Sequence, residues 1–161
     1  MNYETLVPIT GIIQNISQSS NNCCHQTITI NTPNGTNNFV LSPSTEVVGS
    51  AQLRSGMPVA AFYDSSLPVP LIYPPRFQAE LIAPLQNDEI VMLNFFRRNL
   101  TASDNSLRLN LARSTRIVTL NGQRYSCPPG GNYLLVYYSV TTRSIPPQTT
   151  PRKIVVLCEE S

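Results

Sequence analysis

Apolar and polar residues alternate along most of this chain, in short runs bounded by Gly, Pro, Asn and Ser. This period of two is typical of β-strands, and helical spacing of apolar residues is almost absent. The alternation predicts strands over Gly11–Ile16, Thr27–Asn31, Asn38–Leu41, Val59–Tyr63, Phe77–Ile82, Ile90–Arg98, Leu107–Leu111, Arg116–Leu120, Tyr133–Ser139 and Lys153–Cys158. Between them, Asn34-Gly35, Asp104-Asn105 and Asn121-Gly122 favour hairpin turns, because these residue types tolerate positive φ. We therefore predict an all-β protein.

An internal repeat accompanies the strand pattern. Thr36–Val48 aligns without gaps on Ser106–Val118, and the first two hairpin turns superpose at the same offset. Further matches follow in the same order, namely Phe62-Tyr63 with Tyr137-Tyr138, Pro75-Arg76 with Pro151-Arg152, and Leu81 with Leu157. Self-similarity of this kind indicates a duplicated structural unit.

Each repeat contains about five short strands, which is typical of a small closed barrel of the OB or SH3 type, or of half a sandwich. We expect two tandem, similar β-lobes over residues 1–82 and 83–161, related by internal duplication. The proline-rich loops Ser65–Arg76 and Thr141–Arg152 precede the final strands, and their prolines cannot donate ladder hydrogen bonds.

The proline-rich segments carry a resemblance. Pro68–Ala79 (PVPLIYPPRFQA) and Ser144–Pro151 (SIPPQTTP) resemble signatures of small duplicated β-rich proteins of unknown function from anaerobic spore-forming Firmicutes. The resemblance extends over nearly the whole chain and departs at the polar insertion Ser17–Gln26. It implies a spore-forming host and a tie to the spore, and it transfers no catalytic residue.

Composition excludes some classes of protein. No segment approaches the about 18 consecutive apolar residues of a membrane helix, and the N-terminus lacks the basic residues of a secretory signal. We expect no membrane partner, synthesis in the cytoplasm without a signal peptide, and, from the resemblance, deposition on the spore surface. The net charge of +2 is too small to argue for nucleic acid as a partner.

The charge is unevenly distributed along the chain. Residues 1–82 carry two Arg and four acidic residues, a balance of −2. Residues 83–161 carry eight Arg, one Lys and five acidic residues, a balance of +4. Chance at low charge density is one explanation, and a subunit whose two ends attract each other head to tail is the other.

Four cysteines are disulfide candidates, and they allow three intramolecular pairings: Cys23, Cys24, Cys127 and Cys158. A bond between the neighbours Cys23 and Cys24 needs a strained ring, so we expect each to pair elsewhere, within the chain or between chains. A buried reduced thiol is the alternative for Cys158. Cys23-Cys24-His25 with a third cysteine lacks the usual spacing of zinc ligands, so we expect neither a metal nor a cofactor.

A basic and aromatic face is a candidate binding surface on the second lobe. Its members would be Phe95, Arg97, Arg108, Arg113 and Arg116. OB folds hold single strands on faces of this kind. The alternative is that solvated Arg residues simply alternate with core residues, and we do not expect nucleic acid to bind.

The sequence contains no recognisable catalytic constellation, so we expect a protein that is not an enzyme. Our first hypothesis is a structural subunit that self-assembles, as a fibre or spore-surface layer, through strand edges and head-to-tail contacts, with disulfide cross-links as an additional link. Thr27–Asn31 and Tyr133–Tyr138 are candidate edges because they are uncharged. The N-terminal residues Tyr3, Leu6, Val7 and Ile9 are assembly candidates, since this segment can add as a strand to a neighbouring copy.

Two alternatives remain open. The N-terminal segment can instead form the first strand of its own lobe. The protein can instead be a monomeric OB-like module that binds an oligosaccharide, a peptide or single-stranded nucleic acid.

Overall fold

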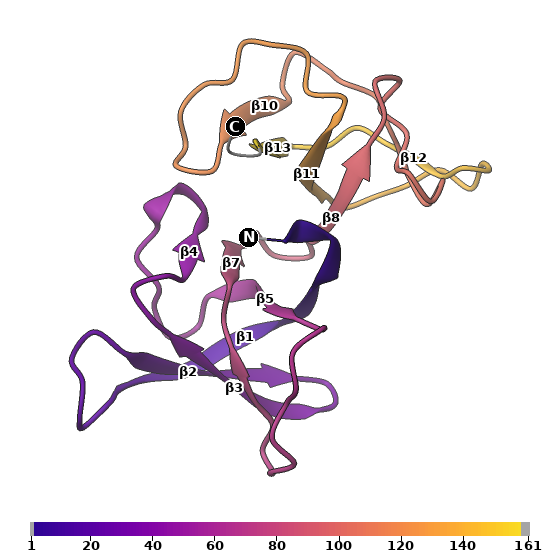
Figure 1. Ribbon diagram of the computed structural model, residues 1–161. Coiled ribbons are helices and arrows are strands. Elements are labelled where there is room, and N and C mark those ends of the chain that lie inside the picture. The colour runs from indigo at the N-terminus through magenta and orange to yellow at the C-terminus, as the bar shows by residue number, and fades with distance from the viewer. Residues whose placement is uncertain (1, 159–161) are drawn as a thin grey trace. The chain divides into compact units, whose positions relative to one another are not determined.

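The computed structural model describes residues 2–158, which form two compact units (Figure 1). The first unit contains Glu4–Asn87 together with Asn2, and the second contains residues 88–158 together with Tyr3. The sequence placed the division after residue 82, which lies inside a strand of the first unit. Apart from the short 3-10 helices η1 (Tyr3–Thr5) and η2 (Val48–Ser50), the regular structure of the described residues is β-strand. The all-β prediction is therefore confirmed.

The first unit is built on one seven-stranded sheet. Its strands are β1 (Leu6–Gln18), β2 (Gln26–Thr32), β3 (Gly35–Leu41), β4 (Glu46–Val47), β5 (Pro58–Asp64), β6 (Arg76–Gln78) and β7 (Leu81–Pro84). They lie in the order β4-β7-β5-β1-β2-β3-β6. The pairs β3–β6 and β4–β7 are parallel, and the other pairs are antiparallel.

Strand β1 connects the two halves of this sheet. Its first half pairs with β5 as far as Ile12, and from Ile12 onward it pairs with β2, with a bulge between Ile13 and Asn15. The alternating apolar residues of the sheet converge on one core: Ile13, Ile28, Ile30, Phe39, Val59, Ala61, Ala79 and Ile82. Phe77 extends this core, since its ring stacks on Tyr63 and on Phe39. Burial of this apolar surface is the main force that stabilises the unit.

The second unit contains a four-stranded sheet and a separate pair of short strands. Its strands are β8 (Ile90–Phe96), β9 (Arg108–Leu109), β10 (Arg116–Thr119), β11 (Asn132–Tyr138), β12 (Gln148–Thr149) and β13 (Lys153–Leu157). The larger sheet has the order β10-β13-β11-β8, and β12 pairs with β9. Its core is formed by Phe96, Ala102, Leu107, Leu109, Leu134, Val136, Ile154 and Val156.

Two features of the predicted fold are wrong. None of the sheets in residues 2–158 is closed into a barrel, of the OB type, the SH3 type or any other. In the second unit, the segment after β8 forms a backbone bridge with that strand at Phe96↔Ala102, and its side chains at Ser103, Asp104 and Ser106 contact Asn94 and Met92, but β9 then pairs with β12 instead. The predicted strand Phe77–Ile82 is also two strands, because Ala79 and Glu80 interrupt it and β6 and β7 pair with different neighbours. Alternation identifies strands, but closure depends on long-range register.

Candidate functional site

From Leu6 onward, the N-terminal segment is a strand of the first unit. Strand β1 pairs with β5 from Leu6↔Asp64 to Ile12↔Pro58, so Leu6, Val7 and Ile9 lie in an intramolecular strand. The structure thus supports the alternative in which this segment is the first strand of its own lobe. Tyr3 precedes the strand in η1, and its ring centroid lies 5.7 Å from that of Tyr133.

The open edge of the second unit is β8. The uncharged segments that the sequence suggested as edges are interior, because β2 lies between β1 and β3, and β11 lies between β8 and β13. Strand β8 ends the sheet opposite β10, and within residues 2–158 no further strand runs along its outer side. Its seven residues include neither a charge nor a proline. Charge and proline are the usual protections of an exposed edge strand.

The direction of the β8 backbone groups follows from the hydrogen bonds at its two sides. The carbonyl of Phe96 accepts from Gly131 on the β11 side, whereas that of Phe95 accepts from Ser103 on the outer side. Because backbone groups alternate along a strand, Val91 and Leu93 point their N–H and C=O groups outward, like Phe95. The β8 edge, as we name the outer side of Val91 and Leu93, therefore directs two donors and two acceptors outward, although Val91 as a whole residue is only 6% exposed and Leu93 is partly buried.

The four cysteines are exposed free thiols. Cys23 and Cys24 lie in the loop between β1 and β2, where Gln18 donates to the Cys23 carbonyl and the Cys24 N–H donates to Asn22 Oδ1. Cys127 and Cys158 also lie at the surface, so the buried thiol considered for Cys158 is wrong. No disulfide joins any of them within the chain, and bonds between chains remain a prediction.

The predicted binding face is only partly brought together. Phe95 packs its ring at 5.4 Å from Tyr133, and Arg97 donates to the Ser103 carbonyl and to Asn105 Oδ1. Arg113 and Arg116 instead line a groove of about 450 Å³ with Arg124. Arg124 was missed because only the pairing of its turn with β10, at Val118↔Arg124, brings it beside the other two.

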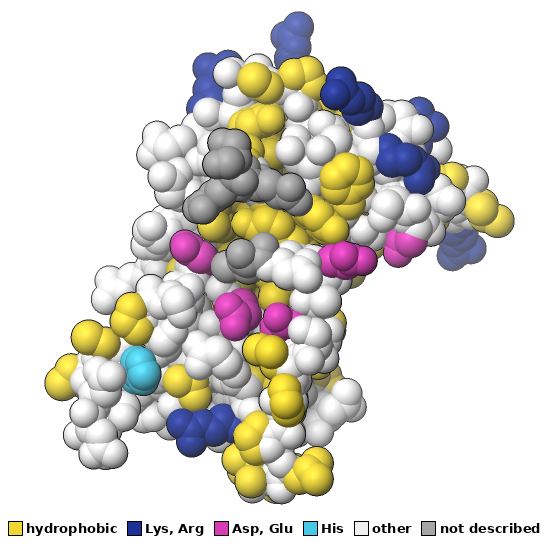
Figure 2. All heavy atoms as spheres, viewed as in Figure 1, with side chains coloured by type: hydrophobic (Ala, Val, Ile, Leu, Met, Phe, Trp, Pro, Cys, Tyr) yellow, Lys and Arg dark blue, Asp and Glu magenta, His cyan; other side chains and the backbone are white. Residues whose placement is uncertain are grey.

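The loop between β5 and β6 presents an apolar surface. Leu71 is fully exposed and Tyr73 is 85% exposed, and Leu67, Val69 and Ile72 in the same loop are also exposed. Figure 2 shows apolar side chains gathered at this end of the first unit, at the bottom of the view. Exposed apolar patches of this kind mark surfaces that contact other molecules.

A buried polar cluster lies beside β8 in the second unit. Glu89 and Arg152 form a bidentate ion pair, with oxygen–nitrogen distances of 2.6 and 2.8 Å. Arg152 and Lys153 both lie over the ring of Tyr137. Burial raises the pKa of Tyr137 and lowers that of Lys153. The Tyr137 hydroxyl has no hydrogen-bond partner among the described residues, so it is a cost to folding.

Within residues 2–158, no group of three His, Cys, Asp or Glu side chains is placed to hold a metal ion. The same residues contain no helix long and apolar enough to cross a membrane.

The chain matches no protein-family model, and no curated protein is significantly similar to it.

Proposed function

We propose that this protein is a non-catalytic structural subunit that assembles with copies of itself. The observation that carries the proposal is the uncharged β8 edge, whose outward donors and acceptors are those that an added strand would pair. Each pairing residue would form backbone hydrogen bonds with a net contribution of about 1 kcal/mol each.

A comparison with the first unit supports this role for β8. Pro8 lies opposite Phe62, and Val91 lies opposite Tyr137. The carbonyls of Phe62 and Tyr137 accept from Glu80 and Arg152, which directly precede the strands on their other side, so Pro8 and Val91 both face outward. Proline at this place removes the outward donor from β1, whereas valine leaves it on β8. Of the two matching edges, the first is protected and the second is open.

We also propose that the two units arose by duplication. The two units share one order of four strands, which is β4-β7-β5-β1 in the first unit and β10-β13-β11-β8 in the second. In both units the first two strands of this order are parallel. A separate parallel pair is matched as well, β3–β6 and β9–β12. Thr45 Oγ1 donates to the Ala79 carbonyl at 2.7 Å, and Thr115 Oγ1 donates to the Pro151 carbonyl at 2.8 Å.

These pairings revise the alignment of the final strands. Asn38 N–H donates to the Pro75 carbonyl, and its counterpart Arg108 donates to the Pro147 carbonyl. Pro75 therefore corresponds to Pro147, and not to Pro151 as the Pro-Arg dipeptides suggested. Ala79 corresponds in the same way to Pro151, which agrees with the paired threonine hydrogen bonds above.

The distribution of charge favours a head-to-tail contact. Figure 2 shows Lys and Arg side chains gathered over the second unit, which also carries the β8 edge. The two halves of the chain carry net charges of opposite sign, which favours pairing of the β8 edge with an edge of the first unit in the next copy. The exposed loop cysteines are placed where they can cross-link copies. A spore-surface location rests on the resemblance of the proline-rich segments alone.

Sedimentation velocity over a wide concentration range, with negative-stain microscopy of the same samples, tests the proposal. We expect the mass of the sedimenting species to rise with protein concentration, and rings or filaments to form. Self-association should be weaker at high salt, because surface charges are then screened. A protein that stays monomeric at the highest concentration would contradict it. No sheet of residues 2–158 is closed into a barrel, so the alternative of an OB-like binding module lacks the support of a closed barrel.

A further inference from the structure

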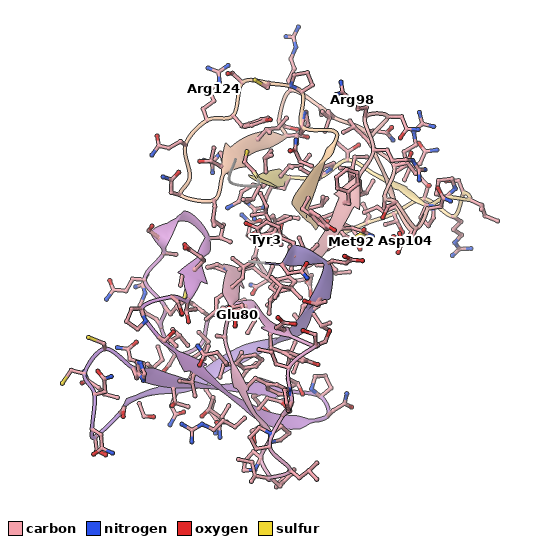
Figure 3. The ribbon with its side chains drawn as sticks, viewed as in Figure 1. Tyr3, Glu80, Met92, Arg98, Asp104 and Arg124 are labelled. Atoms are coloured by element: carbon pink, nitrogen blue, oxygen red, sulfur yellow. The ribbon has the colours of Figure 1, made fainter. Side chains whose placement is uncertain are left out.

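Three arginine side chains line one groove on the second unit. Arg113 precedes β10, Arg116 begins it, and Arg124 lies in the following turn, which returns to β10 through the bridge Val118↔Arg124. The groove has a volume of about 450 Å³, and Tyr125 contributes an aromatic wall. Figure 3 shows Arg124 on the opposite side of the unit from Arg98, so the groove is separate from the surface around Arg98.

The three guanidinium groups are free. None of them forms a hydrogen bond or an ion pair with a residue between 2 and 158, in contrast to Arg97 and Arg152. Among residues 2–158, no carboxylate lines the groove. Arg116 also acts on a fourth cation, because its charge helps to lower the pKa of Lys153. All three side chains are exposed, and like charges along one groove with no counter-charge among residues 2–158 repel one another through solvent, a cost that a bound anion removes.

We propose that this groove binds a multivalent oxyanion, a chain of phosphate groups. The guanidinium group matches phosphate oxygens with two parallel hydrogen bonds, and it keeps its charge at any physiological pH. Three such groups exceed the charge of a single phosphate, so a ligand with several linked phosphates fits them better. The site is independent of self-assembly, since the groove lies on β10, at the opposite edge of the sheet from β8.

Isothermal titration of the full chain with sodium tripolyphosphate tests the proposal. The groove variant is Arg113→Gln with Arg124→Gln, and the control is Arg98→Gln with Arg143→Gln, which removes the same charge from exposed positions of the same unit. We expect the groove variant to bind at least about tenfold more weakly than wild type, equivalent to about 1.4 kcal/mol. We expect the control to bind within about twofold of wild type, the modest change caused by a distant, screened charge.

Three results would overturn the proposal. If the wild-type protein does not bind tripolyphosphate at low ionic strength, the groove is not a phosphate-binding site. Equal losses in the groove variant and the control would indicate a response to net charge alone. If tripolyphosphate does not bind and the groove variant loses self-association in sedimentation, then acidic residues of a second copy occupy the groove instead.

Discussion

The substitution Val91→Pro tests the open edge in the most specific way. Because the N–H of Val91 points away from β11, proline at this place removes an outward donor and leaves the ladder to β11 intact. Pro8 already occupies the matching place on β1, so the sheet geometry accommodates proline there. We expect Val91→Pro to fold and to lose self-association.

The size of the effect follows from one backbone hydrogen bond between copies. Its loss costs about 1 kcal/mol net, and the acceptor left unpaired on the neighbouring copy adds about 1–3 kcal/mol. The lower end of this range is a total of about 2 kcal/mol. It raises the dissociation constant for self-association about thirtyfold, since 1.4 kcal/mol corresponds to a factor of ten.

The control is proline one residue further along. Met92 turns its N–H toward β11, opposite Val136, so Met92→Pro breaks the ladder within the sheet. The lost hydrogen bond and the acceptor left unpaired on β11 together cost about 2–4 kcal/mol, a large part of the about 5–15 kcal/mol that stabilises a typical domain. Circular dichroism measures folding, and sedimentation velocity measures association. The role of the β8 edge would be refuted if Val91→Pro folds and still associates like wild type. It would also be refuted if Val91→Pro and Met92→Pro lose folding stability equally.

Three further predictions concern single side chains. Tyr137→Phe should raise the free energy of unfolding at neutral pH by about 1 kcal/mol, because it removes a buried hydroxyl without a partner. Since burial raises the pKa of Tyr137, wild type should also lose stability above about pH 10, where the tyrosine of the unfolded chain ionises, and the variant should lack this loss in alkaline denaturation. Thr45→Val and Thr115→Val should each cost about 1–2 kcal/mol in urea unfolding, and clearly unequal costs would weaken the proposed equivalence of the two units. Cys23→Ser with Cys24→Ser should abolish any oligomer ladder on non-reducing gels without affecting folding, whereas a ladder that persists would exclude cross-links through these thiols.

Local patterns predicted the strands well. The alternation in Thr27–Asn31 and the apolar run in Tyr133–Tyr138 correspond to β2 and β11, because a strand that buries one or both faces selects such residues. The interruption at Ala79 and Glu80 could not be predicted in this way. Both residues fit a continuous strand, and only the parallel pairing of β6 with β3 and of β7 with β4 separates the two halves.

The candidate surfaces depend on long-range pairing, so the sequence predicted them poorly. The sequences of β8 and β11 are both uncharged, so they do not show which of the two strands forms the edge. The pairing of each strand with its neighbours decides this. Arg124 joins Arg113 and Arg116 through a turn that folds back on β10. Under the proposed duplication, the Pro-Arg match would misalign the last strands, because the backbone hydrogen bonds of Asn38 and Arg108 pair Pro75 with Pro147 instead.

Amide hydrogen exchange, followed by NMR at concentrations below and above the onset of association, measures the β8 edge directly. The N–H groups of Met92 and Asn94 face β11, so they should be protected at every concentration. Those of Val91 and Leu93 face outward, and the account predicts that they exchange rapidly in the monomer and become protected only when copies associate. Rapid exchange of Val91 and Leu93 in a fully associated sample would contradict the assembly of this protein through the β8 edge.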